Sequence, residues 1–293
     1  MAGAHAVQSA VDRFIRSQGW MDGVAEAVQG LVGRAYEALG PNGKTLRNAL
    51  HGTTVLGHPL HPAVTDLPIG AWMVGFVADG TGQDRAADTA HLLTFGALTV
   101  SALSGYTDFH ETYGHERRVA LTHGLTMTTA YGLEAASLLL RAAGARGTAK
   151  MLSAAGLGLI AAGGYLGGDL VYGIGTMVNR NAFLEAPEDF VDVGASGDFP
   201  EGALRRVQAN GAAVLVVRQD GRLNAIGAVC SHAGGPLDEG TLEGGCVTCP
   251  WHGSVFRIDD GTVVNGPATF SQPPFEARER DGRVEVKVAV PLH

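Results

Sequence analysis

The sequence predicts a multidomain protein in which an all-α four-helix transmembrane bundle precedes a small all-β domain. Four apolar stretches, each near the length of about 20 residues that crosses a bilayer as a helix, lie between residues 62 and 178. Short alternating β-rich runs follow after residue 187 and are separated by Asp-Gly turns. The charge changes at the same place: 16 acidic and 9 basic residues from Glu185 onward carry −7 of the formal net charge of −8.

Composition excludes several classes of protein. The chain has 293 residues, of which 45% are hydrophobic and 17% charged, so it is too apolar for a disordered chain and long enough for two domains. It has no basic patch, which disfavours nucleic acid as a partner. Its three cysteines lie within Cys230–Cys249, an odd number that suits a reducing compartment or metal ligation. Residues 1–10 show no export signal, so we expect a cytoplasmic β domain.

Residues 1–50 are expected to form an amphipathic helical N-terminal region. Apolar residues recur at helical spacing between Val7 and Leu39, with breaks near Gly19 and Gly23. The polar face is not strongly basic, so packing against the next domain is at least as good an interpretation as a position on the membrane surface.

Residues 51–180 are assigned to the four-helix transmembrane domain. The fourth stretch contains no charge from Met151 to Gly168, which is hard to reconcile with the wet face of a surface helix. A soluble bundle rich in Ala and Gly is the alternative. Small residues at Gly163 and Gly167, and again at Gly164 and Gly168, predict close approach of this helix to a neighbour. The four stretches are Pro62–Ala78, Ala86–Tyr106, Val119–Leu140 and Met151–Val178.

A linker at residues 181–189 leads to the all-β domain, residues 190–293. Turns are expected at Asp220-Gly221, Asp260-Gly261 and Asp281-Gly282. The expected strands are Leu204–Gln208, Ala213–Val217, Leu223–Ala228, Val255–Ile258 and Val284–Val290.

Two short motifs in the β domain carry metal-binding residues. Cys230 and His232 form a C-x-H motif, and Cys249 and His252 form a C-x-x-H motif. Sixteen residues separate the two motifs. Each loop would supply one thiolate and one imidazole, which suits a [2Fe-2S] cluster with mixed ligands. A structural zinc site also takes two Cys and two His, so zinc is the alternative. Cys246 is interpreted as a small buried side chain in a strand.

The motifs and their flanks resemble the Rieske [2Fe-2S] proteins over about residues 190–290. The resemblance includes residues 233–237, Gly253-Ser254 and residues 265–268. It implies that Cys230 and Cys249 bind one iron of a Rieske-type [2Fe-2S] cluster. It also implies that His232 and His252 bind the other iron near the surface, where electrons would leave through the imidazole edge.

The sequence departs from the respiratory type of Rieske protein. Gly235 and Trp251 stand where that type has a second, disulfide-forming Cys pair, and Phe256 stands where it has an aromatic hydroxyl. Ser254 remains as a hydroxyl donor to a bridging sulfide. These features predict a potential in the lower part of the Rieske range of about −150 to +300 mV. The residues expected to surround the ligands are Pro250, Trp251, Gly253 and Ser254.

The helical part also resembles a known group, an uncharacterised bacterial family of four-helix membrane domains that are sometimes fused to Rieske domains. The similarity covers about residues 52–178 and includes the motif His58-Pro59-Leu60-His61-Pro62. The family implies no activity. If the four helices run up and down in order, six of the eleven histidines lie at the end where the β domain follows.

Two interpretations of the polar groups in the helical part stay open. Interfacial histidines would cap helix ends, whereas ionisable residues at membrane depth would be functional and would bind haem b, a metal or a quinone. His61 and His123 are the first choice as ligands, with His123 and Asp169 expected at the same depth. His91 and Glu134 are expected at matching depth near the opposite end. The candidate residues are His58, His61, Asp66, His110, His115, His123 and Asp169.

These observations predict a membrane-anchored, ferredoxin-like Rieske electron-transfer protein that exchanges electrons with a haem or quinone in its membrane domain. The alternatives are a component of a Rieske oxygenase or other oxidoreductase complex, and a redox sensor with the helices as an anchor only. A stand-alone catalyst is less favoured, since the β domain offers no second iron site outside the cluster motif. The expected partners are the lipid bilayer of the inner membrane, crossed several times, and a redox partner protein. A homo-oligomer is compatible with the sequence.

Overall fold

The computed structural model describes residues 2–289, with side chains from residue 10 onward. The chain forms two compact units. One comprises the residues up to Leu50 together with Leu60–Thr176, and the other comprises His51–Pro59 and the residues from Met177 onward. A helical region is therefore followed by an all-β domain, as expected. The segment His51–Pro59, which the sequence assigned to the membrane domain, packs with the β unit instead.

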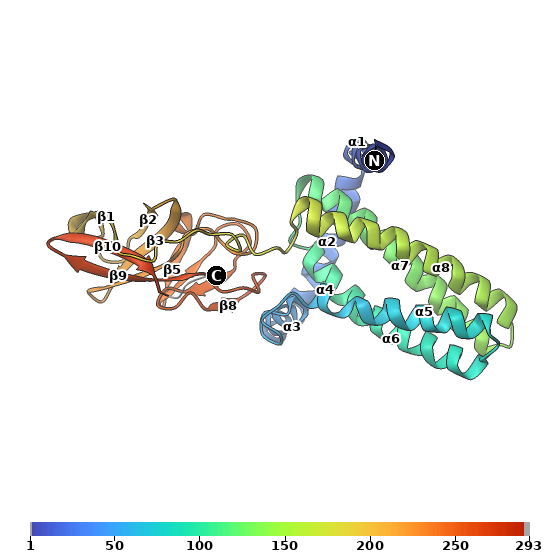
Figure 1. Ribbon diagram of the computed structural model, residues 1–293. Helices are drawn as coiled ribbons and strands as arrows, with labels where there is room; N and C mark the ends of the chain where they lie inside the picture. Colours follow the sequence, from blue (N-terminus) through green and yellow to red (C-terminus); the bar gives the residue numbers. More distant parts are fainter. Residues whose placement is uncertain (1, 290–293) are drawn as a thin grey trace. The chain divides into compact units, whose positions relative to one another are not determined.

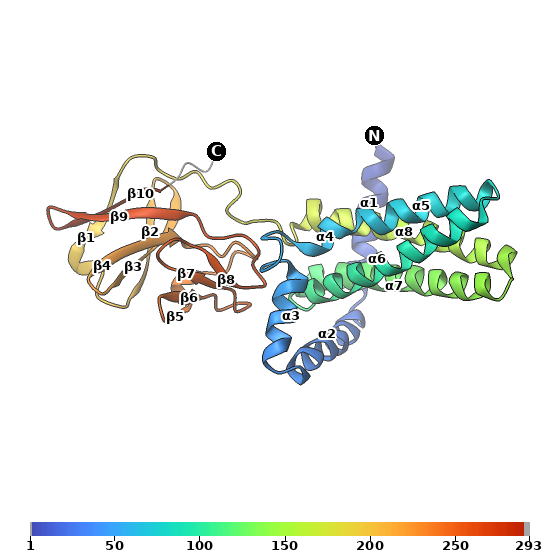
Figure 2. The same ribbon diagram turned by 90° about the horizontal axis from the view of Figure 1, so that it is seen from below.

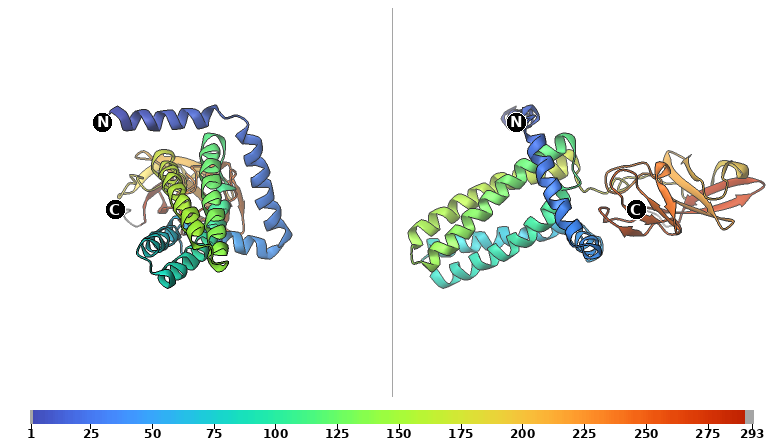
Figure 3. Two further views of the ribbon diagram at one scale, coloured as in Figure 1. Left: turned by 90° about the vertical axis from the view of Figure 1, so that its right-hand side faces the viewer. Right: turned by 180° about the vertical axis from the view of Figure 1, so that it is seen from behind.

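In the helical unit, α5, α6, α7 and α8 form a bundle, and the helices that precede α4 run along its outside (Figure 3). Helix α5 packs on α6, α6 on α7 and α7 on α8, while α8 also contacts α5 (Figures 1 and 2). Gly82 and Gly144 adopt positive φ angles of 70° and 80° where the chain turns from α5 to α6 and from α7 to α8. The helices are α1 Ala2–Ser17, α2 Met21–Ala38, α3 Pro41–His51, α4 Leu60–Val64, α5 Asp66–Gly80, α6 Asp84–Phe109, α7 Gly114–Ala142, α8 Arg146–Gly168 and the π-helical continuation η1 Asp169–Ile174.

Glycines allow α8 to lie close to its neighbours. A Cβ at Gly156 would be 2.5 Å from Cζ2 of Trp72, and a Cβ at Gly163 would be 2.4 Å from Sδ of Met127. Gly167 approaches a side chain of α7 in the same way, whereas Gly164 and Gly168 have open space around them. The expected close contact therefore involves the pair Gly163 and Gly167 and not the second pair.

A buried polar network occupies the end of the bundle where α5 meets α6 and α7 meets α8. Nδ1 of His91 lies 2.7 Å from Oε1 of Glu134, and its Nε2 lies 3.1 Å from Oδ2 of Asp79. Arg141 donates to both carboxylate oxygens of Asp79. The two residues were expected at the same depth, and the structure brings them into direct contact, with both side chains fully buried.

Antiparallel strands build the β unit as two sheets. The larger has the order β1-β10-β9-β4-β3-β2 and the smaller the order β5-β6-β7-β8. Asp220-Gly221 and Asp281-Gly282 have positive φ at both positions, as expected of tight hairpin turns. The strands are β1 Val191–Ala195, β2 Leu204–Ala209, β3 Ala212–Gln219, β4 Arg222–Gly227, β5 Thr241–Glu243, β6 Cys246–Thr248, β7 Val255–Arg257, β8 Val263–Asn265, β9 Pro274–Arg280 and β10 Arg283–Val288, with short 3-10 turns at η2 Ser196–Asp198 and η3 Leu237–Glu239.

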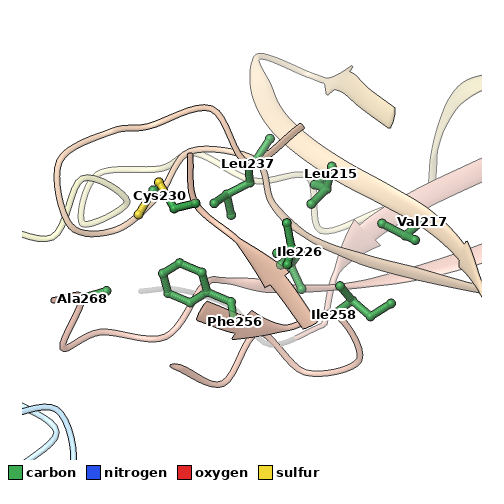
Figure 4. Close-up of a cluster of buried hydrophobic side chains, with 11 residues drawn as sticks. Leu215, Val217, Ile226, Cys230, Leu237, Phe256, Ile258 and Ala268 are labelled. Atoms are coloured by element: carbon green, nitrogen blue, oxygen red, sulfur yellow. The ribbon is translucent and has the colours of Figure 1, made fainter. Parts of the chain in front are cut away.

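All five expected strands are present, and β6 contains Cys246, which was also expected in a strand. The other strands, β1, β5, β8 and β9, were not expected. The sequence of β9 is polar because its charged residues face solvent, and β5 and β8 have only three residues each. The core beneath the motif loops contains Leu237 and Phe256, with Cys230 at its edge (Figure 4). The motif loops therefore rest on a packed apolar layer.

Candidate functional site

Two loops of the β unit hold the motif residues in matching backbone conformations. In the first loop, the amide of Cys230 donates to the carbonyl of Gly235, and the amide of Gly234 donates back to the carbonyl of Cys230. In the second loop, the amide of Cys249 donates to the carbonyl of Ser254, and the amide of Gly253 donates to the carbonyl of Cys249. Gly234 and Gly253 have φ angles of 85° and 72°, which a residue with a side chain rarely adopts. Each loop thus turns its Cys and His to the same side.

The two thiols lie together in the interior. Cys230 and Cys249 are buried and hydrogen-bonded to each other, which raises the pKa of Cys230 and lowers that of Cys249 to about 6. Backbone amides of the residues just after each cysteine donate to its sulfur. Such donors stabilise negative charge on sulfur, which is the state required of a metal ligand. None of the three cysteines forms a disulfide.

The two imidazoles lie together nearer the surface. The ring centres of His232 and His252 are 4.9 Å apart, with their planes at 87°. His232 is buried and His252 is half-buried. Beside them Trp251 exposes 51% of its surface, with its ring 6.5 Å from that of His252. The thiol pair inside and the imidazole pair outside match the implied arrangement of a mixed-ligand cluster.

Gly235 lies directly against the second motif loop. A Cβ at Gly235 would lie 2.7 Å from Sγ of Cys249 and 3.2 Å from the Trp251 ring. A side chain at this position would therefore press on the cysteine sulfur. Within residues 2–289, no three His, Cys, Asp or Glu side chains converge as they do around a single bound ion.

The remaining expected neighbours of the ligands have separate positions. The hydroxyl oxygen of Ser254 accepts from the amide of Ala268 at 3.0 Å, so its own hydrogen is available to a further acceptor. Phe256 is fully buried in the core, whereas Pro250 is exposed. Cys246 lies in a strand as expected, but it is half-buried and not buried.

The segment His51–Pro59 makes a contact within the β unit that no pattern in the sequence indicated. Oγ1 of Thr53 donates to the carbonyl of Ala268 at 2.9 Å. The ring of His58 meets that of Phe270 edge-on, at 5.9 Å between centres. Ala268 also donates to Ser254 and so links the segment to the second motif loop. His58, which was a candidate ligand within the helices, is therefore part of the β unit.

The other candidate histidines fall into two groups. His61 and His123 are neighbours, with ring centres 6.2 Å apart. His110 and His115 instead pair with carboxylates: Nδ1 of His110 with Glu111 at 2.9 Å, and Nε2 of His115 with Asp12 at 2.6 Å. These two pairs fit the interpretation of histidines that stabilise helix ends.

The two aspartates among the candidate residues, Asp66 and Asp169, each lie at the N-terminus of a helix. Asp66 is exposed at the first residue of α5. Asp169 is the first residue of η1, and its Oδ1 would be 2.7 Å from a Cβ at Gly173. The expected proximity of Asp169 to His123 stays a prediction.

Comparisons with known proteins agree with this geometry. Residues 189–276 match the family described as Rieske [2Fe-2S] domain, and residues 57–180 match the family described as Predicted membrane protein (DUF2231). Ferredoxin CarAc of Metapseudomonas resinovorans is 36% identical over 98 residues, which cover 33% of this chain and 92% of the ferredoxin. Apoptosis-inducing factor 3 of Homo sapiens is 33% identical over 106 residues, 36% of this chain, and the match spans only 18% of that protein's length.

A solved complex of reduced oxygenase and oxidized ferredoxin in carbazole 1,9a-dioxygenase contains a chain with 31% identity and a TM-score of 0.34. The match covers 36% of this chain and 99% of that one. The family match resolves the choice between zinc and an iron–sulfur cluster in favour of the [2Fe-2S] cluster. The chain belongs to the Rieske [2Fe-2S] family through residues 189–276, and it carries ahead of them a domain of the predicted membrane protein family DUF2231.

Proposed function

We propose that this protein is a membrane-anchored electron carrier whose Rieske domain exchanges one electron between a soluble redox partner and a redox group in the helical domain. The observation that carries the proposal is the fusion of a cluster-binding domain of the ferredoxin type to a bundle with an apolar outer surface. The ferredoxin relative supports electron transfer as the activity, because the chain covers nearly all of it.

In this proposal Cys230 and Cys249 bind the inner iron, and His232 and His252 bind the outer one. Neutral imidazoles carry less negative charge to the outer iron than thiolates would, so they favour its reduced state and raise the potential above that of an all-Cys cluster. The Ser254 hydroxyl donates to a sulfide, and Phe256 has no hydroxyl to add. The potential then lies in the lower part of the range of about −150 to +300 mV.

The half-buried His252 and the exposed Trp251 mark the surface where a partner would dock. An electron enters or leaves through the imidazole edge, since the thiol side is enclosed by the core. Exposed tryptophan is enriched at protein interfaces because it offers a large contact area at a low cost in conformational entropy. The partner in this proposal is a second redox protein.

The surface of the helical domain supports its placement in a bilayer. Helix α8 with η1, Arg146–Ile174, has the length and hydropathy of a membrane span, the one such helix among residues 2–289. Polar side chains such as Ser101, Ser104 and Thr107 are buried inside the bundle. Large apolar side chains face outward from α5, α6, α7 and α8, the reverse of the usual soluble pattern. They are Leu67, Met73, Val74, Phe76, Val77, Leu92, Leu93, Val100, Leu103, Leu125, Leu139, Met151 and Tyr165.

We place the bundle in the inner membrane as a multi-pass domain, with the Rieske domain on the cytoplasmic side. Cys246, the cysteine that binds no iron in this proposal, forms no disulfide, which suits a compartment that keeps thiols reduced.

A charge on the outer surface of the bundle tests the membrane assignment. Leu93 exposes 51% of its surface near the middle of α6. Leu93→Arg is expected to reduce the amount of protein in the carbonate-washed membrane fraction several-fold, because arginine at the centre of a membrane helix costs about 3 kcal/mol. Val264→Arg is the control, since Val264 is 48% exposed in the β unit and should tolerate the charge. Equal membrane yields of the two variants would contradict the proposal.

A substitution at Gly235 tests whether the two motif loops bind the cluster. Gly235→Ala places a Cβ within 2.7 Å of Sγ of Cys249. We expect a lower iron and sulfide content per chain, because overpacking typically costs about 1–3 kcal/mol and the clash falls on a cluster ligand. Gly197→Ala makes the same change in the β unit where nothing lies within 4 Å, so it should retain the full iron content. If the Gly235→Ala and Gly197→Ala proteins contained equal amounts of iron, the proposal that the cluster binds between the two motif loops would be refuted.

A further inference from the structure

Two histidines from different helices meet inside the helical unit. His61 belongs to α4, which packs on α6, and His123 belongs to α7, which packs on α8. Figure 2 shows α4 and the first turns of α7 at the same end of this unit. The ring centres are 6.2 Å apart and the ring planes meet at 84°. Both side chains are half-buried.

Each ring is fixed by its Nδ1 atom. Nδ1 of His61 lies 2.9 Å from the carbonyl oxygen of Ser101, and Nδ1 of His123 lies 2.8 Å from the carbonyl oxygen of Gly163. A carbonyl only accepts, so Nδ1 carries the hydrogen in both rings and Nε2 carries a lone pair. This is the arrangement found for metal-binding histidines, whose second nitrogen donates to a carbonyl or carboxylate.

The separation of the rings fits one iron between them. A metal–nitrogen bond of about 2.0 Å, and about 1.1 Å from that nitrogen to the ring centre, place two imidazoles on opposite sides of an iron with centres roughly 6.2 Å apart. The observed spacing has this value. A porphyrin supplies four nitrogens to a six-coordinate iron, so two histidines complete the set of ligands.

Glycines stand beside both rings. A Cβ at Gly105 of α6 would lie 2.8 Å from Cε1 of His61, and a Cβ at Gly167 of α8 would lie 3.3 Å from Cε1 of His123. A larger residue at Gly105 would displace the His61 ring. The two helices that supply the anchoring carbonyls therefore also provide the space that the rings need.

We propose that His61 and His123 are the axial ligands of a b-type haem held between α4 and α6 on one side and α7 and α8 on the other. The inference rests on the proposed electron-transfer function and identifies the redox group of the helical domain. When bound, the haem would accept and release single electrons. His61 and His123 would hold its iron, and the carbonyls of Ser101 and Gly163 would keep both rings in the ligating tautomer.

The test uses the full chain, produced with haem supplied and purified in detergent. We expect roughly one haem per chain, with a Soret band and a low-spin ferric EPR signal of large g anisotropy, because the axial ring planes are nearly perpendicular. His61→Ala and His123→Ala should each lose at least about tenfold in haem content. His110→Ala and His115→Ala should keep it, since these rings pair with the carboxylates of Glu111 and Asp12 and not with each other.

Two further measurements make the outcome decisive. His123→Gly should regain the low-spin haem spectrum when imidazole is added, which separates loss of a ligand from loss of the fold. The Rieske EPR signal should persist in every variant. Wild-type protein that shows this signal but takes up no haem, or takes up a metal ion without porphyrin or a quinone instead, would refute the haem site and leave the proposed function standing. Absence of the Rieske signal itself would refute the proposed function.

Discussion

Replacement of His252 by alanine is expected to abolish the Rieske EPR signal while the protein stays in the membrane. The outer iron would lose one of its two protein ligands, and the half-buried position of His252 would let water reach it. His232→Ala should have the same effect, because the two rings lie 4.9 Å apart on the same side of the thiol pair. The helical unit has its own core, so it should keep its fold in both variants.

Two controls separate a ligand from a structural residue. Cys246→Ala should keep the full signal, because Cys246 lies in β6 outside the two motif loops. His252→Cys should retain a [2Fe-2S] cluster whose potential is lower than that of the wild type, because a thiolate brings negative charge to the outer iron. Potentiometric titration followed by EPR measures both. A full Rieske signal in His252→Ala would overturn the assignment of ligands.

Removal of Arg141 is expected to destabilise the helical unit strongly. The guanidinium, 3% exposed, donates two hydrogen bonds to the Asp79 carboxylate, which also faces His91. Arg141→Ala leaves that carboxylate buried without its main counter-charge, and breaking a buried ion pair from one side typically costs about 3–5 kcal/mol. Thermal unfolding of the helical signal in detergent should show a clear decrease in midpoint.

Arg146 provides the matched control. Its side chain is 32% exposed and pairs with Asp88, which also receives a longer contact from Arg141. Arg146→Ala should change the midpoint little, because solvent already screens this pair. Equal losses in the two variants would show that burial does not determine the effect.

Much of the β domain was predictable because its signals are local. Alternating apolar residues and Asp-Gly turns predicted five strands, and the spacing of Cys230, His232, Cys249 and His252 predicted the cluster before any contact was known. The strand β9 escaped prediction because charged residues occupy its solvent face. Its place in the sheet depends on pairing with β10 and β4, which no local pattern encodes.

In the helical domain, too, local features were predictable from the sequence and contacts between helices were not. Hydropathy alone located helices α5 to α8 and placed His91 and Glu134 at matching depth, but it did not predict their contact. The choice of partner for each remaining histidine was not predictable. His61 and His123 were the first choice as ligands, but no local pattern shows which side chains face one another, because this depends on the rotation of each helix about its axis.

The domain order, the cluster motif and the low aromatic, glycine-rich character of the bundle follow from the sequence alone, because they depend on residue type and spacing along the chain. The folded chain was needed to establish the spacing of His61 and His123, the pairing of Arg141 with Asp79, and the bond from Thr53 to the loop behind Ser254. Each of these contacts joins residues at least 60 positions apart. Their geometry follows from how helices and loops pack, and a single sequence carries no local signal for it.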